Sequence, residues 1–136
     1  MKDLARAAIE LRDLIERFAA LSEGALRACA SGDAAVLAAT LDARDLLLSR
    51  ATALAGTIRE RRAALPPSER VALDAMLQPV QHAAEHAAVV NQRVRSAAAN
   101  AREDVGRQLD QLRVESGATA AYGTAAPGFV AFDAVR

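Results

Sequence analysis

The sequence predicts an all-α fold: an elongated antiparallel three-helix bundle or coiled coil, followed by a flexible C-terminal tail. Hydrophobic residues make up 52% of the 136 residues, but there are only three Phe, one Tyr and no Trp, and about a quarter of the chain is alanine. Alanine favours helices and lets helix backbones approach closely, whereas strands would need more β-branched and aromatic residues. Apolar residues also recur at alternating three- and four-residue steps, which is the spacing of one helix face.

The first predicted helix covers about residues 2–30, and its apolar positions form one broad stripe. These positions are Leu4, Ala8, Leu11, Leu14, Ile15, Phe18, Leu21, Ala25 and Cys29. The helix should end at Ser31-Gly32-Asp33, because Gly32 supplies a left-handed C-terminal cap and Asp33 can cap the next helix through its carboxylate. So short a connection predicts an antiparallel hairpin.

The second predicted helix covers about residues 33–64 and repeats the apolar pattern. Its expected core positions are Leu37, Leu41, Leu48, Ala51, Leu54, Ala55, Ile58 and Leu65. Arg59, Arg61 and Arg62 lie near its end, where cations complement the helix dipole, so this basic cluster needs no ligand to explain it. Pro66 and Pro67 then separate this helix from the next, because proline is tolerated in the first turn of a helix.

The third predicted helix covers about residues 67–115. Its expected core positions are Val71, Met76, Val80, Ala83, Ala87, Val90, Val94, Ala97, Ala101, Val105, Leu109 and Leu112. Pro79 cannot donate a backbone hydrogen bond to the preceding turn, so we expect a kink or a break near Leu77. The chain is too short for two independent cores. We therefore expect one helical domain over residues 1–115 and a flexible tail over residues 116–136.

Three of the four aromatic residues lie in the expected tail, at Tyr122, Phe129 and Phe132. This segment has almost no charge and no helical periodicity, so it has little means of burying the rings within its own fold. We interpret them as contacts for a partner protein. The alternative is that the tail folds back and covers a groove of the bundle.

Charge and hydropathy argue against several classes of function. The 17 basic and 17 acidic residues are interspersed, without the basic patch that binds phosphate groups, so we do not expect a nucleic-acid partner. The first residues carry a charge every few positions, so we expect neither a signal peptide nor membrane insertion. The single cysteine, Cys29, allows no internal disulfide and suits the reducing cytoplasm, and we interpret it as a small buried residue.

One motif could support chemistry, the H-x-x-E-H pattern formed by His82, Glu85 and His86. Two histidines one turn apart could bind zinc, with Glu85 as the general base. A catalytic zinc also needs a third protein ligand and a shaped cleft, and the acidic residues downstream lie too far along the same helix. We therefore favour exposed histidines, with metal binding by the pair and a zinc hydrolase as alternatives, and expect no enzyme activity, cofactor, catalytic residue or metal ligand.

The segment VVNQRVRSAAANAREDVGRQLDQLRVESGATAAYGTAAPG resembles the closing segment of FlgN-type flagellar export chaperones. In that family a long last helix that contains Asn continues into a Tyr-Gly tail, which corresponds here to Tyr122-Gly123 followed by Gly128. The chain length and the two preceding Leu- and Ala-rich helices are also similar to the family. The resemblance therefore covers essentially the whole chain.

This resemblance implies a cytoplasmic chaperone that binds the C-terminal helical segments of flagellar hook–filament junction proteins until type III export. An apolar helix would lie in a groove, with the tail ordered by the client. The implied client contacts are Val90, Val94, Val105, Leu109, Leu112, Tyr122, Gly123, Phe129 and Phe132. Flagellar hook-associated proteins and export apparatus components are the implied partners. The alternative is a general helical scaffold or self-associating coiled coil without a client, and periodicity leaves both a monomer and a homodimer open.

Overall fold

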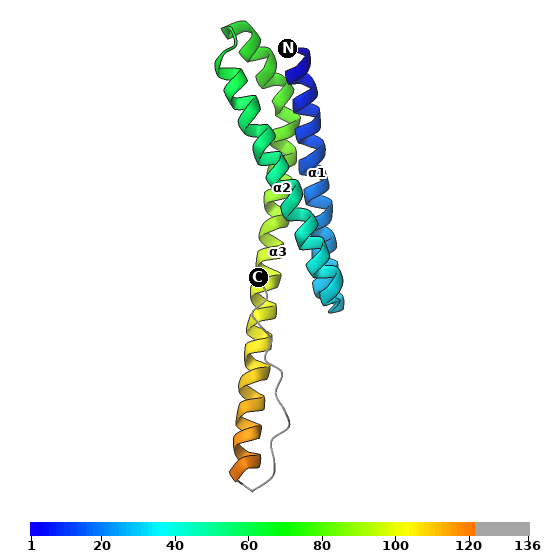
Figure 1. Ribbon diagram of the computed structural model, residues 1–136, viewed down its shortest axis with the longest axis vertical. Coiled ribbons are helices and arrows are strands. Elements are labelled where there is room, and N and C mark those ends of the chain that lie inside the picture. The colour runs from blue at the N-terminus through cyan, green and yellow to red at the C-terminus, as the bar shows by residue number, and fades with distance from the viewer. Residues whose placement is uncertain (122–136) are drawn as a thin grey trace. The chain divides into compact units, whose positions relative to one another are not determined.

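The computed structural model describes residues 1–121, which form three α-helices and no strand (Figure 1). Helix α1 covers Lys2–Ser31, α2 covers Ala34–Ala63 and α3 covers Pro67–Ala121. The all-α prediction is confirmed, and each helix begins within one residue of its predicted start. The chain divides into two units, which we call unit 1 (Met1–Arg95) and unit 2 (Ser96–Arg136). Unit 1 is an antiparallel three-helix bundle.

The connection between α1 and α2 uses the predicted glycine and aspartate. Gly32 has φ 72° and ψ 18°, the left-handed conformation that glycine adopts at no steric cost because it lacks a Cβ atom. The Asp33 side chain accepts a hydrogen bond from the Val36 backbone N–H at 3.1 Å, which caps the start of α2. Both predicted caps are confirmed, and α1 and α2 form an antiparallel hairpin (Figure 1).

One apolar core joins all three helices of unit 1. Its buried members are Leu4, Ala8, Leu11, Leu14, Ala51, Ile58, Leu73 and Val80. A smaller cluster unites Phe18 and Ala19 of α1 with Ala87 of α3. Helix α1 contributes nine buried residues, whereas α2 contributes only two, Ala51 and Ile58. Much of the apolar surface of α2 is therefore not used by the bundle.

Several predicted core positions are wrong. The residues that are exposed instead are Leu48, Val71, Met76, Ala101, Val105 and Leu112. In unit 1 the neighbouring Leu73 is fully buried in the core, and Leu47 and Leu77 are partly buried against it. Successive residues point about 100° apart on a helix, so adjacent apolar residues define two overlapping stripes. Only the position of the neighbouring helices decides which stripe is covered.

Helix α3 continues without interruption through Pro79, so of the predicted kink or break near Leu77 the break is wrong, whereas the kink stays a prediction. Proline removes one backbone hydrogen bond, the one to the carbonyl of Ala75. Ala75 and Pro79 are both exposed, so water can bond to that carbonyl. The buried side chains of Leu73 and Val80, on either side of this point, hold both parts of the helix on the same core.

Helix α3 also extends to Ala121, beyond its predicted end at Glu115. The added residues, SGATAA, include three alanines, which are strong helix formers, and the cost of Gly117 does not outweigh them. The rest of the predicted flexible tail, residues 122–136, lies outside the described residues.

An ion pair that the sequence analysis did not predict joins α2 to α3 near their connecting turn. Arg62 Nε and Nη2 donate hydrogen bonds to the two carboxylate oxygens of Asp74, at 2.6 and 2.7 Å. Such two-pronged pairs are geometrically specific. Arg70 Nε adds a hydrogen bond to the Leu65 carbonyl at 2.8 Å. Arg62 therefore has a defined side-chain partner, in addition to its favourable place at the end of α2.

We predict that this ion pair makes stability depend on pH. The hydrogen bond from Arg62 lowers the pKa of Asp74 from its ordinary value of 3.8. A carboxyl group whose pKa is lower in the folded state stabilises the fold when ionised, and this contribution is lost as the pH falls through the folded-state pKa. Asp74→Asn should therefore lower the Tm at neutral pH and have progressively less effect below about pH 4. Thermal unfolding followed by circular dichroism over a pH series measures the difference.

Glu10→Gln provides the control for this prediction, because Glu10 is exposed and its carboxylate has no ion pair among the described residues. The Tm of this variant should stay close to that of the parent protein at every pH. A loss of Tm in Asp74→Asn that is the same at acidic and neutral pH would contradict the assigned role of the ion pair.

Candidate functional site

The candidate protein-binding surface is an apolar face of α3 in unit 2. Ala97, Ala101, Val105, Leu109 and Leu112 follow one another at steps of three and four, so they share one side of the helix. Val105 and Leu112 are each 47% exposed, and Leu109 is half-buried. Within the described part of unit 2, α3 is the sole helix or strand. We call these five residues the α3 C-terminal face.

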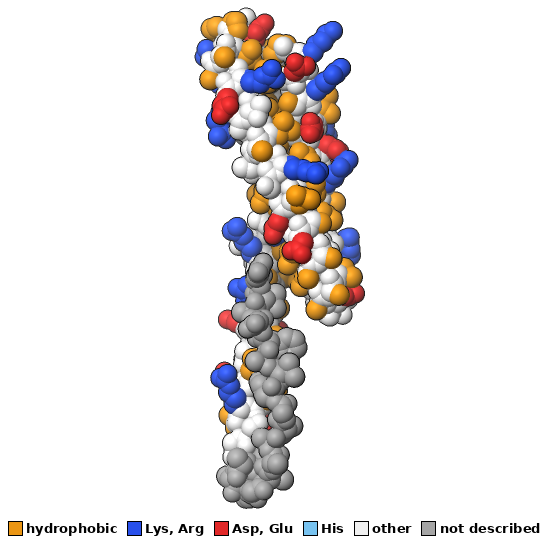
Figure 2. Space-filling view, in the orientation of Figure 1, with side chains coloured by type: hydrophobic (Ala, Val, Ile, Leu, Met, Phe, Trp, Pro, Cys, Tyr) orange, Lys and Arg blue, Asp and Glu red, His pale blue; other side chains and the backbone are white. Residues whose placement is uncertain are grey.

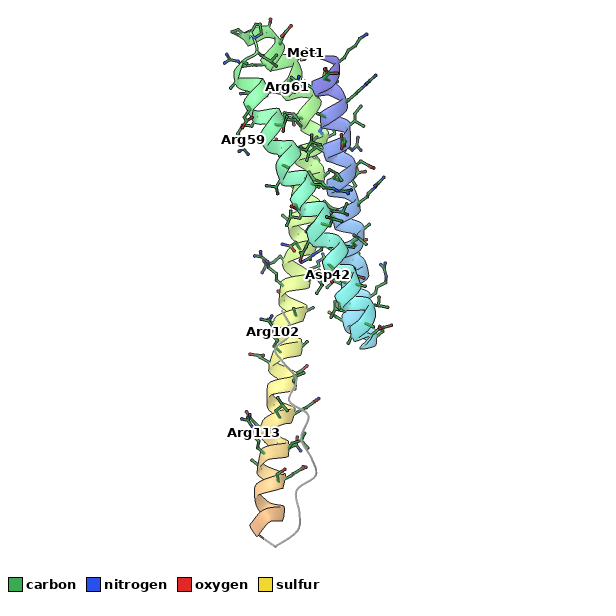
Figure 3. All side chains as sticks on the ribbon, viewed as in Figure 1. Met1, Asp42, Arg59, Arg61, Arg102 and Arg113 are labelled. Carbon is green, nitrogen blue, oxygen red and sulfur yellow. The ribbon has the colours of Figure 1, made fainter. Side chains whose placement is uncertain are left out.

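Charged side chains flank the α3 C-terminal face. Arg107 pairs with Asp104, and Arg113 Nη1 lies 3.7 Å from Asp110 Oδ1; Figure 3 labels Arg113 on α3. All four side chains are largely exposed. Exposed pairs of this kind contribute little to stability. They can, however, set the orientation in which a charged partner helix lies against the apolar face.

The two other predicted contacts on α3 belong to the interior of unit 1. Val90 is 1% exposed and Val94 is 4% exposed. The structure thus places Val105, Leu109 and Leu112 together on an accessible face. Val90 and Val94 are buried in unit 1 and are not part of that face. A partner could contact Val90 or Val94 only after the bundle had opened. The four predicted contacts in the tail are Tyr122, Gly123, Phe129 and Phe132, and they lie outside the described residues.

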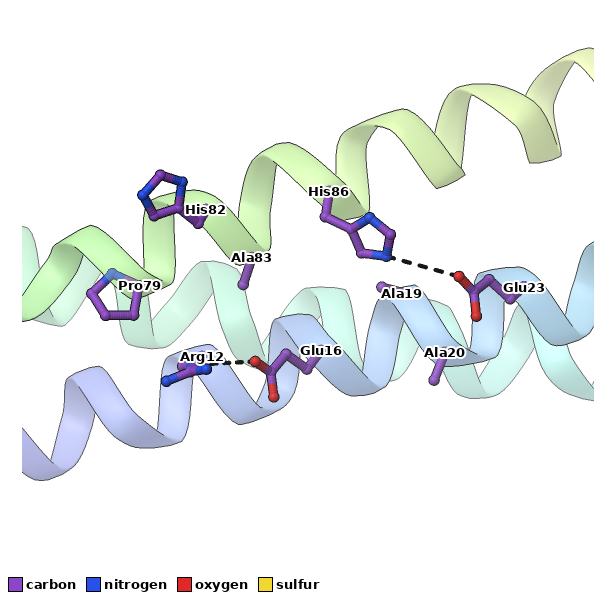
Figure 4. A pocket seen from close by; sticks show the side chains of 9 residues that line it. All are labelled: Arg12, Glu16, Ala19, Ala20, Glu23, Pro79, His82, Ala83 and His86. Carbon is purple, nitrogen blue, oxygen red and sulfur yellow. Dashed lines mark hydrogen bonds and ion pairs between the residues drawn. The ribbon is translucent and has the colours of Figure 1, made fainter.

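The H-x-x-E-H motif lies on the exposed surface of α3 in unit 1, and Figure 4 shows its two histidines, His82 and His86. His82 Nδ1 lies 3.8 Å from Glu85 Oε2, and His86 Nε2 lies 3.8 Å from Glu23 Oε1 on α1. The two histidine side chains are 77% and 63% exposed. Among the described residues, no group of three His, Cys, Asp or Glu side chains is placed to hold a metal ion. The described residues therefore supply no third protein ligand for the zinc ion that the zinc-hydrolase alternative requires.

His82 and His86 also line an open depression of about 630 Å³ between α1 and α3 (Figure 4). Its rim is polar because it is formed largely by charged side chains and histidines. Arg12 donates a hydrogen bond to Glu16 at 2.9 Å, and Glu23 faces His86. Three alanines and Pro79 complete the lining. Ligand sites normally bury most of a bound molecule among apolar side chains. The exposed polar rim is a poor match for this requirement, so we do not choose the depression as the candidate site.

A polar contact between α1 and α2 was not predicted from the sequence. The Arg44 guanidinium carbon lies 5.2 Å from the centre of the Phe18 ring, and Nη1 donates a hydrogen bond to the buried Ser22 hydroxyl at 3.5 Å. Arg44 Nε is buried without a hydrogen-bond partner among the described residues. Burial lowers the pKa of Arg44, Asp45 raises it and Arg95 lowers it further. The signals that could have revealed this contact are the polar Ser22 in an apolar stripe and Arg44 in a leucine-rich run.

The partly buried Arg44 guanidinium contacts both Phe18 and Ser22 on α1 in the observed alignment of α1 and α2. We therefore interpret Arg44 as a residue that favours this register of the hairpin, since a shift of either helix would remove both contacts from a partly buried charge. This role is structural, and it leaves the α3 C-terminal face as the candidate functional site.

No protein-family model, curated protein or solved structure matches the chain. Within the described residues, none of the three helices combines the length and the apolar character that crossing a bilayer requires. The choice of the candidate site therefore depends on the exposure and spacing of the side chains of this chain itself.

Proposed function

We propose that this protein is an export chaperone of the FlgN type. It binds the C-terminal helical segments of flagellar hook–filament junction proteins in the cytoplasm and prevents their assembly before type III export. The single observation that supports this proposal best is the exposed α3 C-terminal face. The identity of the proposed client is taken from the resemblance of residues 89–128 to the closing segment of FlgN-type chaperones.

The spacing of this face suits the binding of an amphipathic helix. Val105, Leu109 and Leu112 stand at positions i, i+4 and i+7, which is the pattern by which helices are held in apolar grooves. Burying a Val or Leu side chain contributes about 1.5–3 kcal/mol. Several such contacts can supply a useful affinity after the cost of ordering the partner is subtracted.

The tail is proposed to extend this surface. Tyr122, Phe129 and Phe132 follow α3 directly in the sequence, and aromatic rings are common anchors at protein interfaces. In the proposed cycle the chaperone holds the client through the α3 C-terminal face and the tail, and then passes it to components of the export apparatus.

We predict that charged substitutions on the α3 C-terminal face weaken client binding. In a titration, the full-length protein is added to a fluorescent peptide that contains the C-terminal helical segment of a hook–filament junction protein. Val105→Asp and Leu112→Asp should each raise the Kd by about 10- to 100-fold, because each removes an apolar contact worth about 1.5–3 kcal/mol and buries a carboxylate. Fluorescence anisotropy measures the Kd.

Val114→Asp is the matched control for these variants. Val114 lies on the same helix and is 72% exposed, but at about 100° per residue it points away from Val105 and Leu112. Its substitution should leave the Kd unchanged, and circular dichroism should show the same helix content in all three variants. Failure of the unchanged protein to bind the peptide, or an equal loss in all three variants, would overturn the proposal.

A further inference from the structure

Helix α2 has large apolar side chains that the bundle does not cover. Val36, Leu46 and Leu48 are 49%, 57% and 49% exposed. A surface helix usually confines its apolar residues to one stripe facing the core. Figure 2 shows such exposed apolar side chains between the charged ones on the visible surface of the bundle. At about 100° per residue, Leu46 points about 80° away from Val36 and about 160° away from Leu48, so these exposed apolar side chains lie on different sides of α2.

Leu46 is the centre of a symmetric series along one side of α2. The series has steps of four and three residues, so its members share one helix face, and all of them are exposed. We call it the α2 outer face, and its residues are Ala35, Ala39, Asp42, Leu46, Arg50, Ala53 and Thr57. Figure 3 labels Asp42 on this helix. The acidic Asp42 and the basic Arg50 each lie four residues from Leu46, one before it and one after it. Ala39 and Ala53 each lie seven residues from Leu46 in the same way.

We propose that a second copy of this chain docks on the α2 outer face, with the two α2 helices antiparallel about a two-fold axis that passes through Leu46. Leu46 then meets Leu46 of the second copy at the axis. Asp42 lies beside Arg50 of the second copy, and Ala39 lies beside Ala53. Because the interface is symmetric, each of these unlike pairs forms twice.

Charge complementarity favours a second copy of the chain as the occupant. Neither Asp42 nor Arg50 takes part in an ion pair among the described residues. In the antiparallel arrangement both side chains gain an oppositely charged neighbour, whereas a parallel arrangement would place Asp42 against Asp42 and Arg50 against Arg50. A two-fold interface must be complementary to itself, and this face meets that condition.

The side-chain sizes along the face also suit helix packing. The short side chains of Ala39 and Ala53 allow the two backbones to approach, while Leu46 fills the space at the axis. One helix pair makes a small interface, so we expect association to be weak and to depend on protein concentration. The α2 outer face shares no residue with the α3 C-terminal face, so this inference does not depend on client binding.

Sedimentation equilibrium of the full-length protein over a range of concentrations tests the proposal. The chain mass is 14.3 kDa, and the fraction of a species with twice this mass should rise with concentration. Leu46→Asp should abolish that species, and Asp42→Arg should reduce it because it places two arginines together. In the double variant Asp42→Arg/Arg50→Asp, each introduced arginine again lies beside an aspartate of the second copy, so this variant should recover the dimer.

Ile9→Asp is the control, because Ile9 is 71% exposed on α1 and lies outside the α2 outer face. It should leave the dimer fraction unchanged, and circular dichroism should show that every variant keeps its helix content. A protein that stays monomeric at all concentrations would overturn the proposal. So would a dimer that survives Leu46→Asp, or one that the double charge exchange fails to restore.

Disulfide cross-linking tests the antiparallel orientation separately. In a Cys29→Ser background, Ala39→Cys and Ala53→Cys place one thiol each on the α2 outer face. A mixture of the two variants should form mixed disulfide dimers on oxidation, whereas each variant alone should stay largely uncross-linked. Efficient cross-linking of each variant with itself would indicate a parallel arrangement and would contradict the proposed axis.

Discussion

Leu73→Ala should lower the free energy of unfolding by about 2–5 kcal/mol. Leu73 is fully buried and belongs to the cluster that joins α1, α2 and α3. Truncation removes the transfer free energy of the side chain and leaves a cavity that can close only if one of the helices moves. Urea unfolding followed by circular dichroism measures the change, at one fixed protein concentration because dimerisation would add to the apparent stability.

Val71→Ala is the matched control for this experiment. Val71 precedes Leu73 by two residues on the same helix but is 70% exposed, so its truncation should change the free energy of unfolding by less than about 0.5 kcal/mol. The comparison also decides between the core position expected from the sequence and the one in the structure. A larger loss for Val71→Ala than for Leu73→Ala would show that α3 is rotated relative to the arrangement described above.

Pro79→Ala should raise the free energy of unfolding by about 1–3 kcal/mol. Proline in a helix interior costs about 3 kcal/mol relative to alanine, and Pro79 lies inside the uninterrupted helix α3. Alanine restores a backbone N–H that can bond to the Ala75 carbonyl. Part of the gain is lost, because proline also restricts the unfolded chain by about 0.4–1 kcal/mol. The same urea unfolding experiment gives the value.

Pro79→Gly provides a second comparison at this position. Pro79→Gly restores the same N–H but introduces a residue that costs about 1 kcal/mol relative to alanine in a helix, so its gain should be smaller. The expected order of stability is therefore alanine, then glycine, then proline. If proline proved as stable as alanine, the helix would have to accommodate its ring without the usual loss.

The features of the fold that were predicted correctly depend on interactions between near neighbours in the chain. Gly32 and Asp33 end one helix and start the next through their own backbone conformation and side-chain hydrogen bond. Pro67 begins α3 because its fixed backbone angle suits the first turn. Each of these effects acts within about one turn of helix, so a local sequence pattern is enough to predict it.

Pro79 shows where local reasoning fails. Its missing N–H correctly indicates a weak point, but helix formation is cooperative and the buried side chains on either side favour one continuous helix. The same applies to Arg62, whose partner Asp74 lies on the next helix and cannot be inferred from spacing along one helix.

The candidate site was predicted in part. Val105, Leu109 and Leu112 are exposed or half-buried on one face, as a binding surface requires, but Val90 and Val94 belong to the same apolar series and are buried. Periodicity assigns all five to one stripe, because it depends only on the geometry of α3. Burial depends on whether another helix covers the stripe at that point.

Composition and periodicity thus suffice for an all-α chain, the starts and caps of its helices and the existence of their apolar stripes, since hydrogen bonding and propensity act over a few residues. The packing of the three helices settles which of several adjacent apolar residues is buried, how Arg44 and Arg62 find their partners, and which stretch of each stripe remains exposed. These properties depend on contacts between residues far apart in the chain, because a side chain is buried only where another helix lies against it.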